Sequence, residues 1–368
     1  MNLTNKKIAV LGSGVCGLHL ALAFVEKGFC VSVFSTRKKT PASLASHGII
    51  CHKGYTLARD NLFYEKLEGS YKLLERILFL EKETGLKIPH QKGVFEFFQN
   101  NEEEKKLRTR IYHRQFTGCF QSEFLRGEKL FKKAQNSSVL FEKKPSGAYV
   151  YPESFSFDAL SYLEVLKKYL ESKGVLFEEV YLEGIERGKE GYFLLKEGEK
   201  EEFSQILCAL GSETESFLKP LNLDLEAFKF SEGFTLRFSF KQKINPFSAI
   251  VFQKNFNASE SCLTVGSYDF SQLNKECLDK KCLNNPCVNK NCLNNQARFF
   301  PGFSKGFLSS LFPETKVFSG VRVYQKSRAP YLKCFLGEKG SKLVVLTGMY
   351  KSGFSLAEIY AEKALSYF

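Results

Sequence analysis

The residues whose types and spacing could carry chemistry begin with three glycines, Gly12, Gly14 and Gly17, in the stretch GSGVCG. Gly12 would allow a tight turn out of a strand, Gly14 would let a pyrophosphate approach the backbone, and Gly17 would let helix and strand pack closely. The N–H groups and the positive dipole of the following helix would hold the anion. The motif predicts a dinucleotide site, which also includes the intervening residues Ser13, Val15 and Cys16.

The elements that must position this motif lie on both sides of it. An apolar run from Ile8 to Leu11 precedes it, and a second, β-branched run from Val31 to Phe34 follows. Between these runs, Ala21 and Gly28 occur at helical spacing. A strand, a glycine turn, a helix and a second strand form a βαβ unit, so we expect an α/β fold with a Rossmann-type sheet.

The end of the second run bears on which dinucleotide binds. A Rossmann unit usually carries Asp or Glu there to bind a ribose hydroxyl, whereas this chain has Ser35, followed by Thr36 and Arg37. In isolation, a missing acid followed by arginine favours the 2′-phosphate of NADP. NADP-dependent reduction is therefore one interpretation of this segment, and the segments described below favour another.

Length and composition limit the class of protein. A chain of 368 residues exceeds one ordinary core and suggests two interlocked domains. Hydrophobic residues make up 43% and charged residues 25%, as in ordinary globular proteins. No apolar stretch reaches the roughly 18 residues that a membrane span needs. The apolar stretch that starts at Ile8 is interpreted as part of the folded domain and not as a signal peptide. Several of the 11 cysteines fall in expected core elements, which suits a reducing compartment, so we expect a cytoplasmic protein.

The formal net charge of +13 has two explanations. It could come from a lysine-rich composition that solvates an ordinary surface, or it could create a field that attracts nucleic acid or another polyanion. Basic residues cluster at 37–39 and between Lys105 and Arg114, but three glutamates at 102–104 precede the second cluster. The charge alone leaves both explanations open, and tRNA bound through a basic surface is one candidate partner.

Three further segments combine apolar runs with small residues: PASLASHG (41–48), QILCALGS (205–212) and LVVLTGMYKSGF (343–354). Together with the glycine motif, and in this order, they resemble the FAD-binding signatures of the D-amino-acid oxidase superfamily, which includes glycine and sarcosine oxidases. The resemblance spans residues 6–366. It implies FAD as the cofactor and a glutathione-reductase-like FAD-binding domain, with an interleaved substrate domain built on a mixed β-sheet.

The resemblance also implies how the chain is divided. The FAD-binding domain would comprise residues 1–90, 151–220 and 321–368, and the substrate domain residues 91–150 and 221–320, with a cysteine-rich loop at 275–295. The residue pattern itself predicts helices at 56–86 and 156–174, and strands at 93–98, at 175–180 and in several runs between 228 and 270.

By the same resemblance, the loop after the second strand passes beside the flavin ring, and a glycine turn near the C-terminus meets the ring's far edge. The loop contains Ser46, His47 and Gly48. The turn, whose positive field would stabilise anionic reduced flavin, contains Gly348, Lys351, Ser352 and Gly353. Val180 would approach the adenine, and Gly211 would end a buried strand of the cofactor domain. The alternative is that these glycines only shape turns.

The segment GVRVYQKSRAPY (320–331) resembles a Gly-Leu-Arg-Pro segment of the family, whose arginine binds the substrate carboxylate. Arg322 would form this bidentate ion pair, to which a planar guanidinium is suited, and a structural ion pair is the alternative. His47 and His52 could move protons near the ring, or could simply be satisfied polar groups. Ser327 and Lys333 replace the family's usual Asp and Gly, which bears on the substrate more than on flavin binding.

The activity that the resemblance implies is oxidation of a neutral amine by hydride transfer from its α-carbon to flavin N5. Within the superfamily, the chain looks closest to the FAD-dependent oxidase half of the bifunctional enzyme that matures 5-methylaminomethyl-2-thiouridine at the tRNA wobble position. The shared features are the missing acid after the second strand, a near match to Ala-Ser-Gly at Ala45 to His47, and the segment from His90 to Phe95. A tRNA-borne amine would then be the substrate; a free amino acid, or a flavin-binding protein without catalysis, are the alternatives.

Four cysteines recur every five residues, at Cys277, Cys282, Cys287 and Cys292. Four thiols could bind zinc or an iron–sulfur cluster, but structural zinc sites usually use pairs two to four residues apart. On a helix, a step of five residues turns by about 140°, so the thiols would not share a face. We expect an expanded surface loop here and no metal site.

Overall fold

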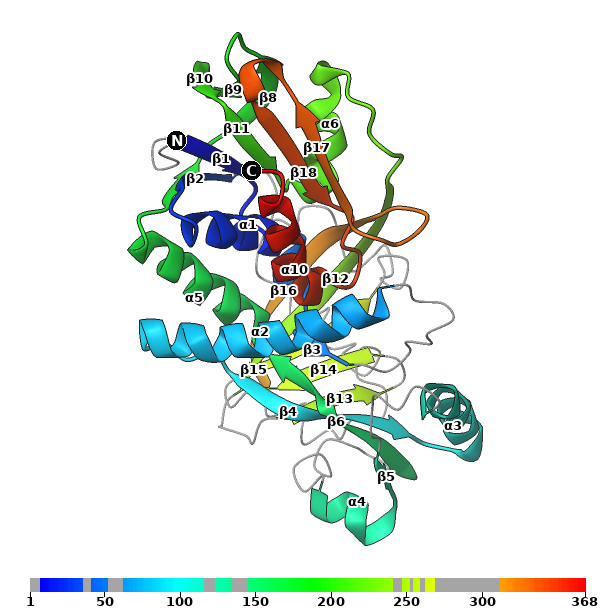
Figure 1. The fold of residues 1–368 in the computed structure, drawn as a ribbon. Helices are drawn as coiled ribbons and strands as arrows, with labels where there is room; N and C mark the ends of the chain where they lie inside the picture. Colours follow the sequence, from blue (N-terminus) through cyan, green and yellow to red (C-terminus); the bar gives the residue numbers. More distant parts are fainter. Residues whose placement is uncertain are drawn as a thin grey trace.

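The computed structural model describes residues 7–35, 41–51, 62–115, 123–133, 145–240, 247–251, 254–258, 262–268 and 311–368. Thr36, Arg37, His52 and the cysteine repeat lie outside these ranges, so the expectations for them remain predictions. The described residues confirm the expected α/β architecture with a Rossmann-type sheet and a mixed sheet (Figure 1). Strands of the two sheets alternate along the chain.

The expected βαβ unit opens the fold. It consists of β1 (Lys7–Leu11), α1 (Val15–Val25) and β2 (Cys30–Ser35). Among the described strands, the sheet around it has the order β17-β18-β11-β1-β2-β7. The added strands are β7 (Leu176–Glu179), β11 (Gln205–Cys208), β17 (Tyr331–Leu336) and β18 (Lys342–Thr347). Only β17 pairs in an antiparallel manner, so the other five strands end at one edge of the sheet.

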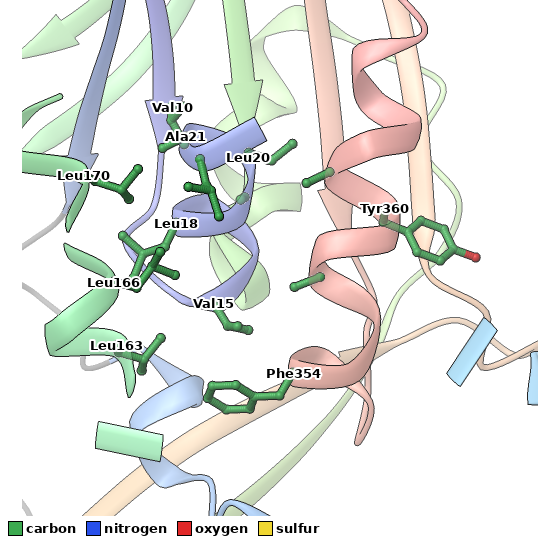
Figure 2. Packing of buried hydrophobic residues seen from close by; sticks show 14 of the residues in the cluster. Val10, Val15, Leu18, Leu20, Ala21, Leu163, Leu166, Leu170, Phe354 and Tyr360 are labelled. Carbon is green, nitrogen blue, oxygen red and sulfur yellow. The ribbon is translucent and has the colours of Figure 1, made fainter. Parts of the chain in front are cut away.

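Helix α1 is buried between this sheet and two other helices, α5 (Ala159–Ser172) and α10 (Gly353–Leu365). Figure 2 shows Leu163, Leu166 and Leu170 of α5 on one side of α1, and Phe354 of α10 beneath its first turn. All of these side chains are buried. This apolar packing fixes the helix whose N-terminus follows the glycine motif.

One of the two expected helices begins later than the residue pattern indicated, and the first residues expected for the other, 56–61, lie outside the described ranges. The helix expected at 156–174 is α5, because Asp158 caps it by accepting the Ser161 N–H (3.0 Å) and the two preceding residues complete strand β6 (Gly147–Phe157). The helix expected at 56–86 is α2 (Phe63–Thr84), which ends where Gly85 adopts a φ of 69°. Figure 1 shows α2 crossing the molecule between the two sheets.

Nine of the described strands form the mixed sheet. They follow the path β16-β12-β15-β14-β13-β4-β6-β3, with β5 paired to β6. The strands expected at 93–98 and between 228 and 270 are confirmed as parts of this sheet. Besides β6, its members are β3 (Ile49–Ile50), β4 (His90–Phe98), β5 (Glu123–Leu125), β12 (Lys229–Phe240), β13 (Phe247–Val251), β14 (Lys254–Ala258), β15 (Cys262–Tyr268) and β16 (Leu311–Tyr324).

The remaining elements flank the two sheets. A small sheet contains β8 (Leu182–Arg187), β9 (Tyr192–Lys196) and β10 (Glu199–Phe203). The other helices are α3 (Asn101–Gln115) and the shorter α4 (Gly127–Lys133) and α6 (Thr214–Leu218). The 3-10 turns include η2 (Ala42–Ala45) and η3 (Gly211–Glu213). Within the described ranges, no helix is long and apolar enough to cross a membrane.

A buried ion pair ties α5 to the mixed sheet. Arg237 of β12 donates from Nη1 and Nη2 to the two carboxylate oxygens of Asp158, at 3.1 and 2.7 Å. Burial by itself raises the pKa of Asp158, but the hydrogen bonds and positive charge of Arg237 outweigh it and hold the pKa below its usual value. The carboxylate that caps α5 therefore stays ionised at neutral pH.

We expect Asp158→Asn to lower the free energy of unfolding by about 3–5 kcal/mol at pH 7, because Arg237 would lose its counter-charge. The folded-state pKa of Asp158 is the lower one, so the pair's contribution is complete above about pH 4 and is lost as the pH falls through the folded-state value. Urea unfolding at pH 7 and pH 3 measures both effects.

The matched control is Asp224→Asn, which removes a carboxylate that is 99% exposed and lies 3.5 Å from Lys333 Nζ. It should change the free energy of unfolding by less than about 1 kcal/mol. Equal losses for the two variants at pH 7 would show that the buried pair does not stabilise the fold.

Candidate functional site

The turn after β1 has room only for glycine. Gly12 adopts a φ of 105°, and a Cβ there would lie 2.5 Å from the Ala209 carbonyl oxygen. Its N–H donates to the Phe34 carbonyl at 2.8 Å. A Cβ at Gly17 would lie 1.8 Å from the Gly12 carbonyl oxygen. These distances are shorter than van der Waals contact, so the turn and the start of α1 pack backbone to backbone, as the motif predicts.

The N-terminus of α1 is arranged to receive an anion. Gly14 precedes the helix in an extended conformation without a side-chain cap, and the first turn contains no acidic residue. Ser43 approaches from the neighbouring loop: its Oγ accepts the Val15 N–H at 3.0 Å and would lie 3.3 Å from a Cβ at Gly14. A helix start whose N-cap residue is glycine, with a hydroxyl beside it, fits a pyrophosphate. Ser43 was not among the expected site residues; its only signal is its place in the segment 41–48.

Five expected cofactor residues lie where the five parallel strands end. They are Gly12, Ser35, Val180, Gly211 and Gly348, at the ends of β1, β2, β7, β11 and β18. The Ser35 carbonyl accepts the Val180 N–H at 3.0 Å, which brings the ends of β2 and β7 together. Gly211 adopts a φ of 59°, and a Cβ there would meet nothing within 4 Å. This edge, beside the first strand of a Rossmann-type sheet, is where such sheets bind ligands.

The loop from η2 to Gly48 is clamped between two strands of the mixed sheet. Gly48 adopts a φ of 64°, and a Cβ there would lie 1.9 Å from the Phe157 carbonyl oxygen. The Phe157 N–H donates to the Gly48 carbonyl at 2.8 Å, and Ser46 Oγ accepts the Gly48 N–H at 3.2 Å. From the other side, Thr235 Oγ1 of β12 donates to the Ala45 carbonyl at 2.5 Å. These bonds fix the backbone on both sides of His47.

One face of the mixed sheet meets this loop. In the pairing of β12 with β16, Thr235 stands opposite Phe318 and Ser231 opposite Arg322. Alternate residues of a strand share a face, so residues 318, 320 and 322 lie on the face that carries Thr235. A Cβ at Gly320 would lie 2.7 Å from the Cα of Ala42, which confirms that this face packs against η2. Arg322 therefore projects on the side of the sheet that faces the loop.

The glycine turn before α10 is joined to the same strand. The Tyr350 N–H donates to the Val323 carbonyl of β16 at 3.1 Å. Gly348 has a φ of 77°, and the Ser352 N–H closes the turn on the Met349 carbonyl at 2.9 Å. A Cβ at Gly353 would lie 3.4 Å from Cγ1 of Val15, so the turn also borders the start of α1.

Three segments that are distant in the sequence come together at His47: its own loop, strand β16 with Arg322, and the turn with Lys351. Burial is the largest cause that lowers the pKa of His47 to about 3, and the positive charges of Arg322 and Lys351 lower it further. His47 is therefore a neutral imidazole at physiological pH, beside two cations. Arg322 is half-buried and forms no ion pair with any carboxylate in the described ranges. The alternative expectation for Arg322, a structural ion pair, thus has no partner in this part of the chain.

The basic cluster at 105–114 is partly neutralised where its side chains are described. Lys106 Nζ lies 2.7 Å from Glu102 Oε1, and Arg108 Nε lies 2.7 Å from Glu104 Oε1, both along α3. Glu104 also contacts Arg126. These pairs favour the ordinary solvated surface over a nucleic-acid surface at this helix.

Comparison with known families matches residues 7–364 to the family model described as DAO, FAD dependent oxidoreductase. No curated protein sequence matches the chain. Two solved structures illustrate the likeness of fold. The glycine oxidase from Bacillus cereus ATCC 14579 superposes with a TM-score of 0.76 at 18% identity, over 98% of this chain and 94% of that one. The iminodiacetate oxidase from Chelativorans sp. BNC1 gives 0.75 at 14% identity, over 97% and 94%.

We expect Gly14→Ala to weaken FAD binding at least tenfold without unfolding the protein. Gly14 has a φ of −73°, which alanine adopts freely, but the added methyl group would occupy the space between the helix start and Ser43. Isothermal titration of flavin-free protein with FAD measures the loss. Gly28→Ala is the control, since a Cβ there meets nothing within 4 Å. Its φ of 84° should reduce stability by about 1 kcal/mol and leave FAD affinity unchanged.

We expect the buried histidines to make the fold acid-sensitive well above the carboxylate range. Burial lowers the pKa of His47, and of His19 in α1, to about 3. Between pH 6.5 and 3 the unfolded chain binds protons that the folded chain does not, so stability falls as the pH falls. Each histidine should cost about 1.4 kcal/mol per pH unit in that range. Urea unfolding at pH 7 and 5 should therefore show a smaller loss for His47→Gln than for the wild type, and an identical loss would contradict the assignment.

Proposed function

Because the chain belongs to the DAO family of FAD-dependent oxidoreductases, we propose that it oxidises the C–N bond of a secondary amine that carries a carboxylate. The observation that carries this proposal is Arg322. It is a half-buried guanidinium with no ion-pair partner among the described residues, on the sheet face that meets the His47 loop. A half-buried guanidinium is stabilised by an anion, and a substrate carboxylate supplies one.

The residues that would hold FAD lie at the edge of the Rossmann-type sheet where its parallel strands end, and in the loop and turn beside that edge. The start of α1 with Ser43 suits the pyrophosphate, and the ends of β2 and β7 at Ser35 and Val180 suit the adenosine half. The His47 loop and the turn from Gly348 to Gly353 would border the ring. When bound, FAD supplies the two-electron acceptor for the hydride that leaves the amine's α-carbon.

Arg322 would orient the substrate. Its planar fork can hold both carboxylate oxygens at once, which would fix the position of the amine's α-carbon relative to the bound flavin. Binding in this half-buried position would also remove water from the carboxylate.

The charge of the site would keep the substrate amine neutral. Arg322 and Lys351 both lower the pKa of His47, and the same positive field lowers the pKa of a bound ammonium group. A neutral amine has the lone pair that assists loss of the α-hydride. With a pKa of about 3, His47 would act as a neutral hydrogen-bonding group and not as a proton acceptor.

We infer that the amine is carried by a tRNA wobble uridine. The net charge of +13 and the resemblance of two segments, 45–47 and 90–95, to the tRNA-modifying oxidase support this choice. A cytoplasmic location would follow from it. The second candidate is a free amino acid or iminodiacetate-type substrate, which the fold likeness to glycine and iminodiacetate oxidases favours. A flavin-binding protein without catalysis is the third, favoured by the unusual Lys333, which pairs with Asp224.

The test is anaerobic bleaching of the flavin absorbance by added amines, in the wild type and in Arg322→Ala. We expect bleaching by a carboxylate-bearing amine, and a loss of at least 100-fold in its apparent affinity in the variant, because the carboxylate loses a desolvated partner. FAD should remain bound. Arg322→Lys should recover part of the affinity, since it restores the charge without the planar fork.

The matched control is Arg187→Ala, on the exposed end of β8, which should behave as the wild type. Failure of glycine, sarcosine, iminodiacetate and wobble-modified tRNA to bleach the flavin would favour the non-catalytic alternative. Bleaching by free amines alone would rule out the tRNA-borne substrate.

A further inference from the structure

Two tyrosines continue the substrate-facing surface beyond Arg322. Tyr324 follows Arg322 by two residues on β16, so it lies on the same face of the strand, about 7 Å further on. Its ring centroid is 4.9 Å from that of Tyr350, in the turn before α10, with an angle of 54° between the ring planes. Both side chains are partly exposed. The pair offers aromatic surface beside the proposed carboxylate anchor.

Positive charges surround this pair. The guanidinium carbon of Arg328 and the ammonium nitrogen of Lys351 each lie 5.4 Å from the centroid of the Tyr350 ring. Lys229 of β12 stands opposite Tyr324 in the strand pairing, hence on the same face. All three are exposed, and none of them forms an ion pair with a carboxylate in the described ranges. Glu232, the nearest acidic residue along β12, alternates to the opposite face.

The turn that carries Arg328 is built in a fixed conformation. The Arg328 N–H donates to the Gln325 carbonyl at 2.9 Å, and Ser327 Oγ accepts the Ala329 N–H at 3.2 Å. The Gln325 side chain is buried and is hydrogen-bonded to Ser327 Oγ at 3.2 Å. Arg328 and Tyr350 both hold positive φ angles, 60° and 49°, which non-glycine residues adopt at a cost. The surroundings therefore impose the backbone conformation at these two residues.

We propose that Tyr324, Tyr350, Arg328 and Lys351 form a platform that binds a nucleotide of the amine substrate. Aromatic rings with unpaired cations suit a base that stacks and a phosphate that neutralises charge, which is how proteins hold single-stranded RNA. A free amino acid would need Arg322 alone. The inference rests on the proposed tRNA-borne substrate, and it locates the contact beside the site rather than on the paired charges of α3.

The experiment measures binding of a fluorescein-labelled, unmodified RNA stem-loop to FAD-loaded protein, by anisotropy at several potassium chloride concentrations. Arg328→Asn keeps a residue that tolerates positive φ. It should weaken binding about fivefold and lower the salt slope by about one. Tyr324→Leu should weaken binding about tenfold with an unchanged slope, and Tyr324→Phe should bind as the wild type, because stacking needs the ring and not the hydroxyl. Arg187→Asn, an equal charge change on β8, is the control and should bind as the wild type.

Absence of RNA binding by the wild type, or equal losses in Arg328→Asn and Arg187→Asn, would overturn the platform. The same variants are tested for anaerobic bleaching by a free carboxylate-bearing amine. Slower bleaching or a shifted flavin spectrum in Arg328→Asn or Tyr324→Leu would also overturn it, since these two residues would then belong to the flavin site. If no amine bleaches the flavin but RNA binding still depends on Tyr324 and Arg328, the platform stands and the proposed oxidation fails.

Discussion

The site depends on a close approach of backbone to backbone where the loop after β2 meets the mixed sheet. At Gly48 and at Gly320 a single added methyl group would overlap a carbonyl oxygen or a Cα of the other segment. Hydrogen bonds from Thr235 and Phe157 hold the loop at that distance. Because the loop cannot move away from the mixed sheet without breaking these bonds, the position of His47 relative to Arg322 is set by the main chain. Side chains at the site then need only the right chemistry, since their placement is already determined.

The sequence predicts those parts of the fold whose cause is local. The glycine motif, the apolar runs around it and the period of α5 each follow from neighbouring residues, and the structure confirms them. The exact start of α5 was missed because it depends on Asp158 as a cap, and Asp158 is held by Arg237 from a strand far along the chain. Ser43 was missed for a related reason: nothing in a serine-containing turn indicates that its hydroxyl will meet the start of α1. The neutral state of His47 also requires three segments that only folding brings together.

The electrostatics of the site resemble an incomplete ion pair. Elsewhere in the described chain, buried charges have partners: Asp158 has Arg237, and Arg76 contacts both Glu358 and Glu26. At the site, the half-buried Arg322 has no carboxylate partner among the described residues, and the neighbouring His47 carries no charge. Leaving cations without counter-charges costs stability, which proteins accept at functional sites and offset elsewhere. The missing negative charge then has to come from what binds there, so Arg322, which weakens the empty fold, strengthens the occupied one.

The strand order has a consequence for how the protein is made. In the Rossmann-type sheet the first strand, β1, pairs on one side with β11, whose other neighbour is β18, close to the C-terminus. The surroundings of the glycine motif are completed only when residues beyond 350 have been synthesised. Until then, apolar faces of β1 and α1 lack part of their packing partners, and aggregation competes with the long-range pairing that would bury them. A chain cut before β18 would therefore leave one edge of β11 unpaired and α1 without the packing of α10.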